Sequence, residues 1–228
     1  MEKLELNFLI DAIISSLIVD LGISEFEAEA ISKLNWREFL QLIPITNQLR
    51  EEKFGNKVRL CGIVNAKSGR CPEDCKFCAQ SSHWRAEIKT YPLLSAQELV
   101  ASARRAKQNG AREFSIVTSG KGIKSEKELE EIVRAVKEIA QLGLEPCASL
   151  GIISESALKL LKEAGLVRYH HNLESSKNFY PRICTTHSWE ESYQVVKTAK
   201  ELGLKVCSGG IFGLGESWED RIELALEL

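Results

Sequence analysis

The 228-residue sequence lacks an excess of charge of either sign, and it lacks a long uninterrupted hydrophobic stretch. Its formal net charge of −2 gives no basic field for nucleic acid or an anionic membrane, so a small-molecule partner is favoured. The longest apolar run, residues 7–23, is interrupted by Asp11 and Asp20 and has neither a basic start nor a small-residue cleavage site. These absences argue against a transmembrane helix and against a signal peptide.

Cysteine, by contrast, occurs seven times. In a sequence without a secretion signal, this number indicates a reducing compartment, where thiols stay free to bind metals. We therefore expect a cytoplasmic protein. A hydrophobic content of 44% over this length is enough to build the core of one large domain or of two small ones.

Three of the cysteines form a CxxxCxxC pattern, Cys71, Cys75 and Cys78, in a loop that Gly69 and Pro72 open. Soft sulfur ligands this close together suit a metal ion or an iron–sulfur cluster. A structural zinc usually takes four ligands from two separate CxxC pairs, and the sequence has no second pair. Three cysteines on a four-iron cluster leave one iron open. The pattern resembles that of the radical S-adenosylmethionine (SAM) superfamily, in which the methionine part of SAM takes the open iron.

Residues 4–54 carry the start and stop signals of short helices. Ser24 followed by Glu27 predicts a capping box at the start of one helix. Pro44 is predicted to close a segment that begins near Trp36, and Gly55 is predicted to end the next segment. We interpret residues 1–56 as a small helical cap at the amino terminus.

From residue 58 onward, predicted strands and helices alternate. A β-rich run at residues 58–66 leads into the cysteine loop, and in each later unit a serine opens a helix, a glycine ends it and a strand follows. The serines are Ser95, Ser125, Ser154 and Ser188, the glycines are Gly110, Gly143, Gly165 and Gly203, and the strands are residues 113–118, 144–150, 166–173 and 204–212. This alternation predicts an α/β fold over residues 57–228, a partial TIM-type (β/α) barrel of about five parallel strands with its site at their carboxyl ends.

The end of the sequence has no helix stop signal. The last predicted helix begins at Trp218 and runs to Leu228 without a cap or a glycine. An open sheet of five strands has two unpaired edges. We therefore expect a piece of a longer barrel or a chain that depends on a partner.

Three longer stretches make the resemblance more specific. CPEDCKFCAQS at 71–81, HNLESS at 171–176 and VCSGGIFGLGE at 206–216 are similar to segments of the biotin synthases, a radical SAM family. The resemblance implies a sulfurtransferase that inserts sulfur into dethiobiotin to give biotin, the last step of biotin biosynthesis. It implies a 4Fe–4S cluster on the three loop cysteines, SAM, and an auxiliary iron–sulfur cluster as the source of sulfur. It also implies a flavodoxin- or ferredoxin-type electron donor and a homodimer.

Two further stretches resemble the family's SAM contacts. Residues 209–216 match the superfamily pattern GxIxGxxE, which lies along the adenine, and the matching residues are Gly209, Ile211, Gly213 and Glu216. A Rossmann motif fits this stretch poorly because the third glycine is missing. Ser119 and Gly120 occupy the place where the family contacts the methionine amine. The same residues would equally suit an ordinary turn between a strand and a helix.

Asn172 and Glu174 match the family residues that hold ribose hydroxyls and the ureido ring of dethiobiotin, and they are our candidate catalytic residues. Because they alternate along a predicted strand, they should face the same side. The family often has aspartate in place of Glu174 and asparagine in place of His170. His170 and His171 could be neighbours of a cluster, although a histidine at a strand end is more often a hydrogen-bonded core residue.

The auxiliary cluster has an unusual set of candidate ligands. The family uses three strand cysteines and an arginine; Cys147 and Cys207 match two of the cysteines, Ser115 stands at the third, and the arginine is expected beyond the last residue. The third and fifth strands contribute to one interior layer, and Cys61 on the first strand can point into it. We hypothesise ligation by Cys61, Cys147 and Cys207, with Cys184 as a candidate fourth ligand. The alternative is that these cysteines pack as small hydrophobic residues.

Two other functions compete with this one. The first is a radical SAM enzyme that uses only the loop cluster, such as a relative of hydrogenase-maturation enzymes. The second is an inactive protein that binds iron or zinc without turnover, which the small number of strands favours.

Overall fold

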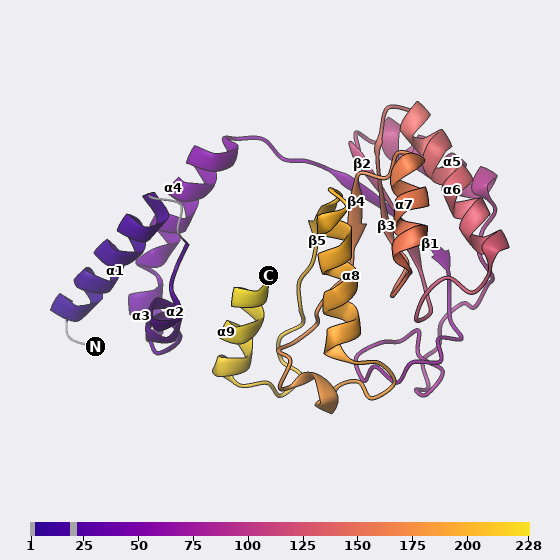
Figure 1. Ribbon diagram of the computed structural model, residues 1–228. Helices are drawn as coiled ribbons and strands as arrows, with labels where there is room; N and C mark the ends of the chain where they lie inside the picture. Colours follow the sequence, from indigo (N-terminus) through magenta and orange to yellow (C-terminus); the bar gives the residue numbers. More distant parts are fainter. Residues whose placement is uncertain (1–2, 19–21) are drawn as a thin grey trace. The chain divides into compact units, whose positions relative to one another are not determined.

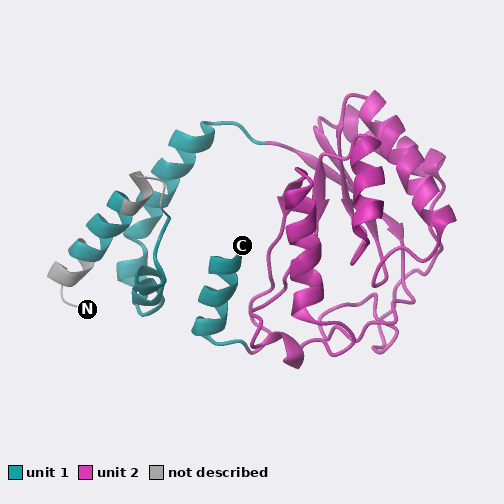
Figure 2. Cartoon of the chain, viewed as in Figure 1, with its two compact units in different colours: residues 1–58, 216–227 teal, residues 59–215, 228 magenta. Residues whose placement is uncertain are grey.

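The computed structural model describes residues 3–18 and 22–228 and divides the chain into two compact units. One unit contains the described part of residues 1–58 together with residues 216–227, and the other contains residues 59–215 and Leu228 (Figure 2). Asp20, which interrupts the apolar run near the amino terminus, lies outside the described residues. Among residues 3–18 and 22–228, no helix combines the length and the hydrophobicity that a membrane crossing requires. The predicted domain boundary at residue 57 stays a prediction.

The smaller unit is helical. Its helices are α1 (Lys3–Ile18), α2 (Glu25–Ser32), α3 (Trp36–Phe39), α4 (Leu42–Phe54) and α9 (Trp218–Glu227). The predicted capping box is confirmed: the Ser24 side chain accepts from the Glu27 backbone N–H, and the Glu27 carboxylate accepts from the Ser24 backbone N–H at 2.6 Å. Pro44 does not end a helix, contrary to the prediction. It lies in the first turn of α4, where its missing N–H costs no hydrogen bond, and Gly55 ends that helix as predicted.

The larger unit is built around one parallel sheet. Its strands are β1 (Cys61–Lys67), β2 (Glu113–Thr118), β3 (Glu145–Ser149), β4 (Arg168–His170) and β5 (Lys205–Cys207). They pair in the order β1-β2-β3-β4-β5, and every pair is parallel (Figure 1). Each neighbouring pair is joined through a helix, which is the repeated β/α connection of a barrel-type sheet. The predicted α/β fold with five parallel strands is confirmed.

Local signals in the sequence set the ends of the connecting helices, which are α5 (Ala96–Gln108), α6 (Glu126–Gln141), α7 (Glu155–Glu163) and α8 (Trp189–Glu201). In every one of these helices, the predicted serine accepts a hydrogen bond from a backbone N–H of the first turn. Gly143 and Gly203 follow α6 and α8 with φ angles of 78° and 77°. Because residues with a side chain rarely adopt this left-handed conformation, these glycines end the helices and turn the chain into β3 and β5.

The two faces of the sheet differ in polarity. The helix-covered face is apolar and packs Phe114, Ile116, Ala148 and Tyr169 against residues of α5–α8, such as Leu99, Val136, Leu158 and Val195. Side chains alternate along a strand, so the neighbouring residues in sequence face the opposite side. That opposite face includes Cys61, Glu113, Ser115, Cys147, Arg168, His170 and Cys207, together with the apolar residues Ile63 and Val117. A polar inner face of this kind is suited to binding a ligand.

Candidate functional site

The cysteine loop follows β1 directly and is held in place at several points. Gly69 has a φ of 74°, and a Cβ there would lie 2.5 Å from Thr90 Oγ1, so only glycine fits at the start of the loop. The Gly69 carbonyl accepts from Ser119 Oγ at 2.9 Å, which ties the loop to the carboxyl end of β2. The backbone of Cys71 accepts from the Ser82 N–H at 2.8 Å and donates to the Gln80 carbonyl at 3.1 Å.

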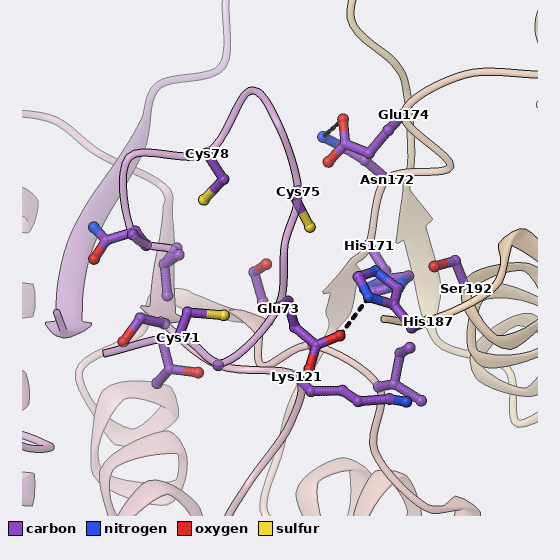
Figure 3. Close-up of a pocket in the computed structure, with 18 of the residues that line it drawn as sticks. Cys71, Glu73, Cys75, Cys78, Lys121, His171, Asn172, Glu174, His187 and Ser192 are labelled. Carbon is purple, nitrogen blue, oxygen red and sulfur yellow. Dashed lines mark hydrogen bonds and ion pairs between the residues drawn. The ribbon is translucent and has the colours of Figure 1, made fainter. Parts of the chain in front are cut away.

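One cavity of about 450 Å³ gathers most of the predicted site residues at the carboxyl ends of the strands. The predicted residues that line it are Cys71, Cys75, Cys78, Ser119, Gly120, Asn172, Glu174 and Cys207. Figure 3 shows the cysteine loop on one side of this cavity, with Asn172, Glu174 and His171 across from it. The carboxyl ends of neighbouring parallel strands meet at one edge, which is why residues so far apart in sequence lie together here.

Two of the loop thiols are in an environment that disfavours their charged form. Burial raises the pKa of the Cys71 thiol and of the Cys75 thiol, and Cys184, followed by the other loop cysteines, raises that of Cys75 further. A thiolate is the form that ligates a metal. Three converging thiolates therefore need a cation among them, and iron ions supply that charge. This donor set fits an iron–sulfur cluster.

Asn172 and Glu174 both line the cavity, but they do not alternate along a strand as predicted, because β4 ends at His170 and both residues lie beyond it. Asn172 Nδ2 donates to Glu174 Oε2 at 3.4 Å. Glu174 has a φ of 65°, which is rare for a residue with a side chain and costs about 1–3 kcal/mol. Burial raises the pKa of Glu174 to about 7, although the hydrogen bond from Asn172 opposes the shift. A strained carboxyl that is half protonated near neutral pH is typical of a functional group.

We expect the Glu174→Gln variant to change how stability depends on pH. A raised carboxyl pKa in the folded state means that wild type loses stability as the pH rises from about 4.5 through about 7. The variant has no carboxyl to ionise, so it should become more stable than wild type by on the order of 2 kcal/mol at pH 8. Urea unfolding at pH 4.5 and at pH 8 measures the difference.

The Glu174→Asp variant is the matched control because it keeps a carboxyl group at this position. It should retain the loss of stability with rising pH. If Glu174→Gln and wild type keep a constant difference in unfolding free energy across this range, Glu174 does not titrate with a raised pKa.

The glycine stretch is divided between the two units. The Gly209 carbonyl accepts from the backbone N–H groups of Leu173 and Glu174, and the Ile211 N–H donates to the Glu174 carbonyl at 2.9 Å. Gly209 and Ile211 thus lie beside the Asn172–Glu174 segment. Glu216 belongs to the helical unit, where its carboxylate pairs with Arg221 at 2.7 Å. The roles of Gly213 and Glu216 in SAM binding stay predictions.

The cysteines of the strands lie on the polar face of the sheet. Cys147 is fully buried, whereas Cys61 and Cys207 are exposed at the ends of their strands. Burial, and next the nearby Glu113 carboxylate, raise the pKa of Cys147 to about 12; the Arg168 guanidinium acts in the opposite direction. Ser115 pairs with Cys147 in the sheet, and its Oγ lies 3.4 Å from His170 Nδ1. The predicted ligand set of Cys61, Cys147 and Cys207 stays a prediction.

The structure places Cys184 away from the position predicted for it. Cys184 Sγ lies 3.7 Å from Cys75 Sγ and 3.2 Å from His187 Nδ1. The charged groups that shift the pKa of the Cys61 thiol are Glu113, Arg168 and Cys207, and Cys184 is not one of them. The loop that carries Cys184 folds onto the cysteine loop and not onto the polar face of the strands. Cys184 is therefore not a fourth ligand with Cys61, Cys147 and Cys207.

Comparison with known proteins places these residues in a family. Residues 66–228 match the model of the radical SAM superfamily. Biotin synthases from Trichlorobacter lovleyi, Pelotomaculum thermopropionicum and Geobacter metallireducens are 47%, 51% and 44% identical to the chain over 96%, 89% and 98% of its residues. The chain belongs to the biotin synthase family of the radical SAM superfamily. It spans 66%, 63% and 68% of the length of these three relatives.

Solved structures share the fold of this biotin synthase family member. Methylornithine synthase (PylB) superimposes with a TM-score of 0.81 at 20% identity, and the match covers 93% of this chain and 62% of that protein. The FeFe-hydrogenase maturase HydG from Carboxydothermus hydrogenoformans superimposes with a TM-score of 0.78 at 19% identity, over 96% of this chain and 52% of that protein. At these identities, the likeness establishes the fold.

Family membership implies a 4Fe–4S cluster and SAM as cofactors. The thiol donors of the cysteine loop fit the cluster because all three line one cavity and offer the soft sulfur ligands that iron–sulfur clusters take. The cavity between that loop and Asn172 offers polar partners for a nucleoside. The site thus contains suitable residues for both groups.

Sequence reasoning missed two residues of this site, Glu73 and His187. Both line the cavity, and His187 Nδ1 lies 2.6 Å from Glu73 Oε2. The available signal was the position of His187 three residues after Cys184, a spacing that suits two ligands of one metal ion. Glu73 offered no comparable signal because its partner lies 114 positions away in the sequence.

Proposed function

We propose that the chain carries out the reaction for which its relatives are named, the radical SAM-dependent insertion of sulfur into dethiobiotin to give biotin. The observation that carries this proposal is the shared cavity, which joins the three loop cysteines to Asn172 and Glu174 and to Cys207. A cofactor, a substrate and a second sulfur-bearing site can meet in such a cavity. The similarity to biotin synthases supports the choice of substrate.

The loop residues have the role of holding the cofactors. In this proposal, Cys71, Cys75 and Cys78 hold the 4Fe–4S cluster. The backbone around Ser119, Gly120, Gly209 and Ile211 holds SAM, together with Gly213 and Glu216 of the matching motif. When bound, the cluster and SAM supply the one-electron chemistry that activates an unreactive carbon. The residues of the chain orient these groups at the carboxyl ends of the strands.

Asn172 and Glu174 have the role of holding hydroxyl and ureido groups. The amide of Asn172 both donates and accepts hydrogen bonds. Because burial raises the pKa of Glu174 to about 7, its carboxyl can also donate or accept near neutral pH. The contact between their side chains fixes both in one orientation. This pair can therefore match a ligand that presents both donors and acceptors.

An auxiliary iron–sulfur cluster on Cys61, Cys147 and Cys207 is part of the proposal. Two buried nitrogen atoms on the same face of the sheet, Arg168 Nε and His170 Nε2, have no hydrogen-bond partner among the described residues. Buried donors of this kind indicate a polar group that is to be bound there. Burial and then the Glu113 carboxylate raise the pKa of the Cys61 and Cys147 thiols, and the positive charge of Arg168 opposes this shift in part. An anionic cluster of thiolates and sulfide suits this position.

The partners in the proposal are dethiobiotin as the substrate, a flavodoxin- or ferredoxin-type protein as the electron donor and a second copy of the chain in a homodimer. The cytoplasm is the proposed compartment, because the thiol ligands remain reduced there. The formal net charge of −2 does not favour nucleic acid or an anionic membrane as a partner.

An anaerobic product assay tests the proposed function. The chain is reconstituted with iron and sulfide, then supplied with a reductant, SAM and dethiobiotin, and both 5′-deoxyadenosine and biotin are measured. We expect both products. Deoxyadenosine without biotin would indicate a radical SAM enzyme that uses only the loop cluster, and neither product would indicate an iron-binding protein without turnover.

A further inference from the structure

Cys184 belongs to a compact group of metal-binding side chains that the proposed function does not use. Its thiol is 3% exposed and lies 3.7 Å from Cys75 Sγ. The ring nitrogens of His187 lie 3.2 Å (Nδ1) and 3.8 Å (Nε2) from Cys184 Sγ. One ligand atom from each of Cys75, Cys184 and His187 falls within 4.8 Å of the others. Two sulfurs and an imidazole in this arrangement are a donor set for a soft divalent metal.

The two loops that carry these residues are fastened to each other. The Lys76 N–H donates to the Ile183 carbonyl at 2.9 Å, and the Asp74 N–H donates to Thr186 Oγ1 at 3.1 Å. The Asp74 carboxylate accepts from the Thr185 N–H at 2.8 Å and from the Thr186 N–H at 3.2 Å. These hydrogen bonds involve none of the proposed ligand atoms, and they fix the position of Cys184 relative to Cys75. The group is therefore preorganised.

Glu73 gives His187 the support that metal-binding histidines typically have. Its carboxylate lies 2.6 Å from Nδ1, and the side chains of Glu73 and His187 are only 9% and 12% exposed. A carboxylate that accepts from one ring nitrogen fixes the tautomer and leaves the other nitrogen free to bind a metal. The contact with Glu73 thus fixes the ring of His187 beside the two thiols, with Nδ1 at 3.2 Å and Nε2 at 3.8 Å from Cys184 Sγ.

The distances match those around a single tetrahedral ion. With metal–sulfur bonds of about 2.3 Å and metal–nitrogen bonds of about 2.0 Å, two sulfurs lie about 3.8 Å apart, and a sulfur and a nitrogen lie about 3.5 Å apart. The observed distance between the two sulfurs is 3.7 Å, and the two ring nitrogens of His187 lie 3.2 Å (Nδ1) and 3.8 Å (Nε2) from Cys184 Sγ, on either side of the sulfur–nitrogen value. In an iron–sulfur cluster each cysteine binds its own iron, so two sulfurs this close suit one shared ion better than two irons.

We propose that Cys75, Cys184 and His187 form a mononuclear site for one soft divalent cation, such as Zn²⁺ or Fe²⁺, with Glu73 as the positioning residue. Because Cys75 is also a proposed ligand of the loop cluster, the mononuclear ion and the cluster exclude each other. The site borders two cavities: Cys75 and His187 line the main cavity, and Cys184 and His187 line a second one of about 690 Å³. The proposal is independent of the substrate of the enzyme.

Cobalt binding to the apo protein tests this site, because Co²⁺ reports its thiolate and imidazole ligands through its absorption bands. The test uses the Cys71→Ser/Cys78→Ser double variant, in which the loop can no longer assemble a cluster. We expect this protein, reduced and free of oxygen, to bind one Co²⁺ with two thiolate ligands. Adding Cys184→Ser should lower the affinity at least about 100-fold, and adding Glu73→Gln should lower it about 10- to 100-fold.

A Cys147→Ser change in the same double variant is the matched control, because it removes a buried cysteine that lies outside the proposed group. It should leave the Co²⁺ affinity unchanged. Circular dichroism checks that each variant is folded. An affinity that stays the same after Cys184→Ser in folded protein would overturn the proposal, and so would an affinity that falls equally after Cys147→Ser.

Competition with cluster assembly is a second measurement, made on the wild-type chain. Preloading with one equivalent of Zn²⁺ should cause a loss of cluster formation during reconstitution, read from the iron and sulfide content. The same preloading should have no effect on the Cys184→Ser variant. Equal inhibition of both proteins would show that zinc binds the three cysteines of the CxxxCxxC loop instead. It would overturn the proposal that Cys75 binds a mononuclear ion together with Cys184. Neither result depends on biotin formation.

Discussion

A Cys71→Ser variant is expected to lose the loop cluster and, with it, nearly all cleavage of SAM. Cys71 is buried, and both its backbone N–H and its carbonyl are bonded within the loop, so its sulfur has one well-defined position. A serine hydroxyl is a hard, weakly acidic ligand that does not replace a thiolate on iron. Because outer-shell changes alone cost metal sites about 10- to 100-fold, the loss of this ligand should leave less than about 1% of deoxyadenosine formation.

The measurement is the iron and sulfide content together with the cluster absorbance, made on anaerobically reconstituted protein. Cys184→Ser is the matched control: it replaces another buried cysteine that lies close to the same loop but outside the CxxxCxxC pattern. This control should keep the cluster. A full cluster in Cys71→Ser, or the same loss in both variants, would falsify the assignment of the CxxxCxxC cysteines.

The features that could be predicted from the sequence depend on neighbouring residues. A capping box needs only Ser188 and Glu191, and a helix end needs only a glycine such as Gly203 in the left-handed conformation. The alternation of strands and helices then follows, and with it the parallel sheet. Pro44 shows the limit of such rules. Proline both follows helices and fits in their first turn, and the local sequence does not distinguish the two cases.

The position of Cys184 could not be predicted because long-range hydrogen bonds determine it. The Asp74 carboxylate holds Thr185 and Thr186, which are 111 and 112 positions away, and these contacts bring Cys184 to Cys75. The alternation rule that placed Cys147 on the inner face applies to strands, and Cys184 lies in a loop. A cysteine in a long loop can join either group, and only the folded loop decides between them.

The polar face of the sheet is organised by charge as well as by sulfur. The Glu113 carboxylate is 8% exposed and pairs with Arg59 at 2.8 Å and with Arg168 at 3.2 Å. The buried Glu113 carboxylate needs a positive partner, and the ion pair with it holds the Arg168 guanidinium in place. Burial and the Glu113 carboxylate raise the pKa of the Cys61 and Cys147 thiols, and the guanidinium of Arg168 partly opposes this shift. The thiolate forms of both residues therefore need a bound cation in addition to Arg168.

A Cys147→Ser variant should separate the two parts of the proposed reaction. Cys147 is fully buried on β3, and it is apart from the loop that cleaves SAM in the proposal. We expect the variant to keep the loop cluster and to keep forming deoxyadenosine. It should lose the auxiliary iron, and biotin formation should fall to less than about 1% of the wild-type level, because a missing ligand costs more than the 10- to 100-fold of an outer-shell change.

Cys207→Ser should have the same effect, because the proposal places both sulfurs on one cluster. Ser149→Ala is the matched control for iron content: Ser149 lies two residues further along β3 on the same face and carries no thiol. Iron and sulfide analysis with Mössbauer spectroscopy distinguishes the auxiliary iron from the loop cluster. If Cys147→Ser keeps its full iron content and its product, Cys147 is a buried thiol that packs as a small hydrophobic residue, and the sulfur that enters the substrate must come from another donor.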